Sequence, residues 1–266
     1  MQIRYAVSTM VFWWRENNLS FEQECQFLRS LGFGVELWPN IKGQDECRYQ
    51  RRNWPRLAGA TEGMLVAMCG RRDRPTLQQW AEQIECAKIF DANIVTDLQN
   101  LRIPIGPTTD NCDFAADIIK LADDSNVKLC LETGPLPALK QIGEKFESIR
   151  YCLDTGYANL DPAYSFKQYI DGLAERLVHL HLTDNYGQTD DHEPPGLRGG
   201  ISRENWNYLL ETLSKYDNEV IGTLEMCPCT PSVMIRQASE FLFDQLSWPN
   251  RPEHQPDYTQ PIYNPT

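Results

Sequence analysis

Short apolar runs separated by amphipathic stretches make up most of residues 1–246. Residues 177–182 alternate with period two, which predicts a strand with His179 and His181 on the same face. The run stops at a turn-prone Thr-Asp-Asn cluster. Comparable apolar runs predict the remaining strands at residues 3–8, 34–38, 64–68, 93–96, 127–132, 151–154 and 220–225.

Amphipathic stretches of helical period lie between many of these runs. Residues 20–31 carry apolar side chains at helical spacing, with Ser20 as the N-cap, Gln23 as its capping-box partner and Gly32 as the terminator. The same pattern predicts further helices at residues 75–90, 113–122, 165–173, 205–215 and 231–246.

Eight strands that alternate with helices over about 245 residues are typical of a single parallel (β/α)8 TIM barrel, an α/β fold. A doubly wound sheet is the alternative, but no glycine-rich phosphate motif follows the first strand. We therefore predict a barrel over residues 1–246. Residues 247–266, rich in Pro, Asn and Gln, predict an extended C-terminal tail, either mobile or laid across the barrel or a neighbouring subunit, and their tyrosines favour docking.

Composition narrows the classes of function. A net charge of −12 and a pI near 4.8 argue against nucleic-acid binding, and the arginine-rich stretches at residues 48–56 and 71–74 are expected to be solvated surface. Neither a secretion signal nor an apolar run long enough to cross a membrane is present, so we expect a cytoplasmic protein. The nine scattered cysteines fit buried thiols in a reducing compartment, and Cys227-Pro228-Cys229 is too tightly spaced for the usual CxxC patterns.

Polar side chains end the last four predicted strands: Glu132, Asp154, His181 and Glu225. Because the C-terminal strand ends of a barrel meet at one mouth, these side chains are expected to converge. Each alone also fits a helix cap or a surface loop. Together, the buried carboxylates would repel unless a cation compensates them. Three oxygen donors and one nitrogen favour Mn²⁺, with Mg²⁺, Co²⁺ and Fe²⁺ as alternatives and Zn²⁺ not excluded.

Aromatic and basic side chains near the predicted mouth are candidates for contacts with a substrate. Trp13, Trp14, Trp38 and Trp54 fit stacking on the face of a bound ligand, although packing of loops and of the barrel exterior explains at least half of them as well. Arg198, in a turn bracketed by glycines, fits recognition of a carboxylate or phosphate, and a surface arginine is the equal alternative.

The motifs LETG, LDTG, HLHLTDN, the DxH pair Asp190 and His192, and TLE occur in this order. In this arrangement the chain resembles the xylose isomerase-like TIM barrel superfamily, specifically its sugar phosphate isomerase/epimerase branch. That branch includes ketose 3-epimerases, hydroxypyruvate isomerase, inosose dehydratase, dehydroshikimate dehydratase and, more distantly, zinc-dependent apurinic endonucleases. The resemblance covers residues 1–246 and is densest over residues 129–225.

The resemblance implies roles for individual residues. Glu132, Asp154, His181 and Glu225 match the family's metal ligands, and the two glutamates match its acid/base pair. Glu36 matches a recurrent glutamate of the second strand, with a structural or substrate-contact role. The loop after His181 is expected to contact substrate or hold the rim, through Asp184, Asp190 and His192.

Two departures from the family pattern concern the endonucleases. The histidine three residues after the strand-six aspartate is Tyr157 here, which can donate to a substrate oxygen but is a poor metal ligand. The ends of the third and fourth strands also lack histidines. A three-zinc phosphodiesterase is therefore disfavoured.

We expect an enzyme: a metal-dependent isomerase or epimerase that acts on a keto-sugar or related polyol through an enediolate. The alternative is a lyase or dehydratase of the same site, with a keto-sugar, cyclitol or 3-keto-glycoside as substrate. A third reading is a binding barrel that has lost turnover. The expected partner is a small carbohydrate, with no nucleic acid and no membrane, and the tail is a candidate arm for a homo-oligomer.

Overall fold

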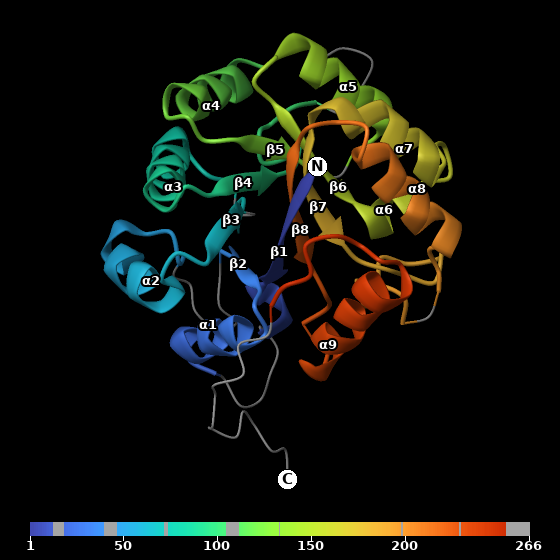
Figure 1. Cartoon of the computed structure of the whole chain (residues 1–266). Helices are drawn as coiled ribbons and strands as arrows, with labels where there is room; N and C mark the ends of the chain where they lie inside the picture. The colour runs from blue at the N-terminus through green and yellow to red at the C-terminus, as the bar shows by residue number, and fades with distance from the viewer. Residues whose placement is uncertain are drawn as a thin grey trace.

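A computed structural model describes residues 1–12, 19–39, 47–71, 74–104, 112–132, 134–197, 199–228 and 230–253. Eight parallel strands close into a barrel in chain order, with β8 paired to β1 (Figure 1). This closed barrel confirms the predicted (β/α)8 fold and shows that the doubly wound alternative is wrong. The strands are β1 (Gln2–Ser8), β2 (Gly34–Leu37), β3 (Leu65–Cys69), β4 (Asn93–Thr96), β5 (Leu129–Leu131), β6 (Arg150–Asp154), β7 (Leu177–Leu182) and β8 (Glu219–Leu224).

Helices surround the strands (Figure 1). They are α1 (Phe21–Ser30), α2 (Trp54–Thr61), α3 (Leu77–Phe90), α4 (Asp113–Asp124), α5 (Leu136–Lys145), α6 (Thr155–Leu160), α7 (Phe166–Leu173), α8 (Arg203–Leu213) and α9 (Val233–Glu240). Short 3₁₀ turns lie at η1 (Thr9–Phe12), η2 (Arg51–Asn53) and η3 (Ala174–Arg176), and a π-helical turn, η4 (Phe241–Gln245), continues α9.

Capping chemistry explains where several helices begin. The Ser20 side chain accepts a hydrogen bond from the Gln23 backbone N–H at 3.3 Å, and Gln23 Oε1 accepts from the Ser20 N–H at 2.8 Å. This reciprocal pair confirms the predicted start of α1. Thr76 and Ser165 form equivalent capping boxes at α3 and α7. The predicted helix at residues 75–90 therefore begins only after its cap, at Leu77.

Three helices escaped sequence-based prediction because their sequences interrupt the helical pattern. Helix α2 has a proline in its first turn and contains Gly59, and α5 follows Pro135 and contains Gly143. Helix α6 is only six residues long and starts directly at the end of β6. Proline is tolerated in the first helical turn, where its missing N–H has no intrahelical partner.

The first part of the predicted tail packs on the barrel. Trp248 is 3% exposed, and its ring meets Trp206 edge-to-face at 6.1 Å. The Tyr5 hydroxyl donates to the Pro249 carbonyl at 2.9 Å, and the Ile3 N–H donates to Asn250 Oδ1 at 3.1 Å. Residues 247–253 therefore lie across the start of β1. Residues 254–266 lie outside the described residues, and a domain boundary at residue 246 stays a prediction.

The cysteines in the described part of the chain are mostly buried, as expected. Seven of the eight cysteines there are buried, all eight are free thiols, and Cys227 is half-buried. Among the described residues, no helix has the length and apolar character needed to span a bilayer.

Replacing the buried indole that anchors residues 247–253 should destabilise the barrel. We expect Trp248→Ala to lower the free energy of unfolding by about 3–5 kcal/mol, because it leaves a cavity against Trp206. Denaturant unfolding followed by circular dichroism measures this change. Val233→Ala, at a side chain that is 58% exposed, is the control and should change stability by less than about 0.5 kcal/mol. Equal stability of the two variants would contradict the anchoring role.

Candidate metal centre

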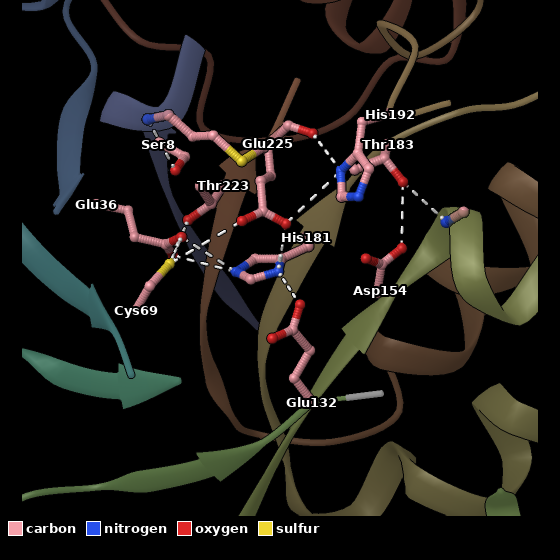
Figure 2. Close-up of polar contacts among 12 residues, drawn as sticks. Ser8, Glu36, Cys69, Glu132, Asp154, His181, Thr183, His192, Thr223 and Glu225 are labelled. Carbon is pink, nitrogen blue, oxygen red and sulfur yellow. Dashed lines mark hydrogen bonds and ion pairs between the residues drawn. The ribbon is translucent and has the colours of Figure 1, made fainter. Parts of the chain in front are cut away.

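The four predicted metal ligands converge at the C-terminal mouth of the barrel. Glu132 follows β5, Asp154 ends β6, His181 lies near the end of β7 and Glu225 follows β8. Each offers one ligand atom, these atoms all lie within 4.8 Å of one another, and all four residues are buried. Figure 2 shows His181 between the two glutamates, with Asp154 beside them. Barrel closure therefore brings together residues that are up to 93 positions apart, from Glu132 to Glu225.

His181 faces a carboxylate at each ring nitrogen. Its Nδ1 lies 2.7 Å from Glu132 Oε1 and 2.9 Å from Glu225 Oε2, and its Nε2 lies 3.1 Å from Glu36 Oε1. Burial alone would lower the pKa of His181, but the negative partners around it raise the pKa well above its usual value. The carboxylates at both ring nitrogens therefore favour the protonated form of His181.

Asp154 combines a helix cap with a place at the mouth. Its Oδ1 accepts hydrogen bonds from the Tyr157 backbone N–H at 2.9 Å and from the Thr183 hydroxyl at 3.2 Å. Burial raises the pKa of Asp154 to about 6; the charges of the two neighbouring glutamates add to this rise, and His192 opposes it. These two donors fix the position of Oδ1 and therefore the orientation of the whole Asp154 carboxylate. Gly156 keeps this corner small, because a Cβ there would collide with the Thr183 hydroxyl.

The DxH loop lies beside Glu225. His192 Nδ1 is 3.2 Å from the Glu225 carbonyl oxygen and 3.8 Å from its Oε2, and His192 Nε2 is 3.4 Å from Asp190 Oδ2. Burial lowers the pKa of His192, but Asp190 and the carboxylates of the mouth outweigh it and raise the pKa to about 10. His192 also has a left-handed backbone, with φ of 47°. Asp190 and His192 therefore lie beside Glu225, and their predicted contact with substrate stays a prediction.

Asp184 instead supports the loop from inside. Its side chain, which is 1% exposed, accepts backbone hydrogen bonds from Asn185 at 2.8 Å, Ile201 at 2.9 Å and Gly196 at 3.1 Å. Its backbone pairs with that of Glu193. These contacts place Asp184 in the framework of the loop, and its predicted contact with substrate stays a prediction.

The predicted aromatic contacts have varied surroundings. The half-buried Tyr157 packs edge-to-face on Tyr169, with ring centroids 6.3 Å apart. Trp38 is half-buried, and its backbone N–H donates to the Thr9 hydroxyl oxygen at 2.9 Å. Trp54 begins α2 and donates its indole N–H to the Tyr49 carbonyl, so it packs in the outer layer. Three predicted site residues lie outside the described residues: Trp13, Trp14 and Arg198.

Further polar residues join the site without having been predicted. The Thr223 hydroxyl donates to Glu36 Oε2 at 2.9 Å, Cys69 Sγ lies 3.1 Å from Glu36 Oε1, and His179 Nε2 lies 2.8 Å from Glu36 Oε2. Period-two alternation would have found two of them, since His179 and Thr223 each lie two residues before a predicted ligand. Cys69 carried no such signal, because β3 is otherwise apolar.

The donor set fits a divalent cation. Three carboxylates and one imidazole nitrogen face one another, and Glu36 adds a fourth buried negative charge beneath them. Among the described residues, the raised pKa values of His181 and His192 give the mouth positive charge that offsets the carboxylates only in part, and a 2+ ion would offset more of this negative charge. Oxygen-rich ligands of this kind suit hard and borderline ions without selecting a single one.

Comparisons with solved structures support this fold. A D-tagatose 3-epimerase-like protein is 17% identical, with a TM-score of 0.67 over 91% of this chain and 97% of that one. An L-ribulose 3-epimerase is 15% identical, with a TM-score of 0.62 over 90% and 86%. A provisionally named xylose isomerase from Rhodospirillum rubrum is 14% identical, with a TM-score of 0.64 over 93% and 100%. These similarities confirm the fold that the family resemblance implied.

No protein-family profile and no curated protein sequence matched the chain.

Metal binding is expected to displace protons, because the ligands must be deprotonated. At about pH 7.5, Asp154 is already ionised, so about one proton per ion should leave, from His181. At about pH 5.5 the release should approach two, and affinity should fall, because Asp154 is then largely protonated. Calorimetric titration with Zn²⁺ in buffers of different ionisation enthalpy measures this release.

Asp154→Asn is the matched control for this titration, since it keeps the capping oxygen and removes the titrating carboxyl. It should bind more weakly and lose the additional proton release at the lower pH. Binding without proton release at either pH would contradict the assignment of His181 and Asp154 as ligands.

Proposed function

We propose that the protein is a divalent-metal-dependent isomerase or epimerase that acts on a keto-sugar or related polyol through an enediolate intermediate. The observation that carries this proposal is the convergence of Glu132, Asp154, His181 and Glu225 within 4.8 Å at the barrel mouth. The similarity of the fold to an L-ribulose 3-epimerase and to a D-tagatose 3-epimerase-like protein supports the same class of substrate.

The proposed cofactor is one divalent ion, Mn²⁺ as first choice, with Mg²⁺, Co²⁺, Fe²⁺ and Zn²⁺ as alternatives. Glu132, Asp154, His181 and Glu225 would hold it. When bound, such an ion polarises the carbonyl and adjacent hydroxyl oxygens of a polyol, which acidifies the C–H bond beside the carbonyl.

Glu132 and Glu225 are proposed as the acid/base pair. They approach His181 Nδ1 at 2.7 Å and 2.9 Å, so both carboxylates border the same reaction space. One of them takes the proton from the carbon beside the carbonyl, and the other returns a proton. Return to the opposite face of the same carbon gives epimerisation, and return to the neighbouring carbon gives isomerisation.

The remaining mouth residues are proposed to bind and orient the substrate. Asp190 and His192 lie beside Glu225 and are proposed to contact hydroxyl groups of the substrate. Tyr157 and Trp38, both half-buried, are proposed to line the space that holds the sugar. The Glu36 side chain has no exposed surface, and its predicted contact with substrate stays a prediction.

A lyase is the second candidate function, and His192 favours it. Its imidazole lies 3.8 Å from Glu225 Oε2, so a proton donor stands next to the proposed base pair. In this reaction a glutamate removes the proton beside the carbonyl, the bond to a β-oxygen breaks, and His192 protonates the departing oxygen. The product is an unsaturated ketone, together with water or an alcohol.

Proton exchange in D₂O tests the proposed chemistry. With Mg²⁺- or Zn²⁺-loaded protein and a panel of ketoses, keto-sugars and inososes, proton NMR should show deuterium entering beside a carbonyl. An epimer or isomer as product supports the first candidate, and an unsaturated ketone supports the lyase. Metal-loaded protein that exchanges no panel member would contradict the proposal.

Amide substitutions test the two glutamates separately. Glu132→Gln and Glu225→Gln should each lower the exchange rate at least about 100-fold, since a positioned acid or base contributes about 10²–10⁴-fold. Glu219→Gln, at a half-exposed carboxylate at the opposite end of β8, is the control and should exchange at the wild-type rate. Full activity in both mouth variants would show that the acid/base assignment is wrong.

A further inference from the structure

Glu36 is a buried carboxylate that the proposed chemistry does not use. It lies on β2, beneath the mouth, and its side chain has no exposed surface. Burying an ionised carboxylate is costly unless hydrogen bonds and charges compensate it. Figure 2 shows Glu36 directed toward His181, on the side of the ring away from Glu132. The buried Glu36 carboxylate therefore requires compensating donors around it.

Four donor groups surround the two oxygens of Glu36. His181 Nε2 and Cys69 Sγ each lie 3.1 Å from Oε1. His179 Nε2 lies 2.8 Å and the Thr223 hydroxyl 2.9 Å from Oε2. A carboxylate accepts about four hydrogen bonds and donates none, so it alone satisfies this set. An amide in its place would offer one accepting oxygen and present its own N–H groups to donors.

The surroundings of His179 support the same assignment of protons. Its ring packs edge-to-face on His181, with centroids 5.3 Å apart. Its Nδ1 has no hydrogen-bond partner among the residues that the structure describes. A bare lone pair at that position costs less than an orphaned N–H group, which places the His179 proton on Nε2, toward Glu36. Glu36 is thus held from both sides by N–H donors.

We propose that Glu36 is a positioning residue that keeps the His181 proton on Nε2 and so presents Nδ1 as the metal-binding nitrogen. Hydrogen bonding at one imidazole nitrogen decides which nitrogen is left to bind a metal. His181 Nδ1 points to the space shared with Glu132 and Glu225, where the other proposed ligands lie. This inference rests on the proposed function, which supplies the metal ion that His181 would bind.

Direct ligation by Glu36 is the competing arrangement. Glu36, Cys69, His181 and Glu225 also offer ligand atoms that lie within 4.8 Å of one another. However, the four donors occupy the accepting positions of both Glu36 oxygens, and an ion there would have to displace them. The observed contacts therefore favour support of His181 over ligation.

Zinc affinity of the full-length chain tests the proposal without relying on activity. Zn²⁺ binding to Glu36→Gln, measured by competition with a chromophoric chelator, should be about 10–100-fold weaker than to the wild type. Glu24→Gln is the matched control: Glu24 is also a buried carboxylate, paired with Arg48 at 3.4 Å, but lies outside the cluster. It should lower thermal stability and leave Zn²⁺ affinity unchanged.

Nitrogen-15 NMR of the histidines reports the tautomer directly, and the chain has only four. In Zn²⁺-loaded wild-type protein, His181, assigned by its loss in His181→Gln, should show a protonated Nε2 and a metal-shifted Nδ1. In Glu36→Gln, the His181 signals should shift or split between tautomers. The wild-type spectrum alone decides the tautomer if Glu36→Gln does not fold.

The outcomes separate this inference from the proposed function. Wild-type protein that binds Zn²⁺ through His181 Nε2, or a Glu36→Gln variant with wild-type affinity and an unchanged His181 spectrum, overturns the inference alone. A loss of affinity far beyond 100-fold, with the His181 tautomer unchanged, identifies Glu36 as a ligand and also overturns it. Wild-type protein that binds no Zn²⁺, Mn²⁺ or Mg²⁺ overturns both.

Discussion

Electrostatic repulsion among buried carboxylates is the constraint on which the mouth of this barrel depends. Glu36, Glu132, Asp154 and Glu225 are each at most 5% exposed and surround the imidazole of His181. Such groups persist in a folded interior only when hydrogen bonds and positive charge compensate them. Each member of this polar network therefore depends on the others, because removing one partner leaves another buried polar group unpaired.

The two halves of the barrel contribute different residues to the candidate site. Strands β5 to β8 end in the residues proposed to bind metal, whereas β2 and β3 contribute Glu36 and Cys69, which contact the cluster from below. The loop after β7 folds back over the rim and is held by Asp184, whose carboxylate binds three backbone N–H groups. Strand ends and a hydrogen-bonded loop provide the preorganisation that the proposed proton transfer would require.

Asp154 shows how one side chain serves both the fold and the site. Its Oδ1 caps α6 and accepts from Thr183, so the same contacts that start the helix fix the direction of the carboxylate. Solved structures that are 14–17% identical to this chain share its fold. A shared fold does not fix the reaction, which depends on individual side chains such as Asp154. The proposed cation-assisted proton transfer rests on such side chains.

Local patterns in the sequence determined the eight strands, the capped starts of α1 and α7 and the common face of His179 and His181, because periodicity and capping act over a few residues. Proline and glycine hid α2 and α5 from the same reasoning. Only the closed barrel decided that Glu36 meets His181 across 145 positions, and that Asp184 faces inward to hold its own loop. Such contacts depend on strand register and barrel closure, which no local pattern encodes.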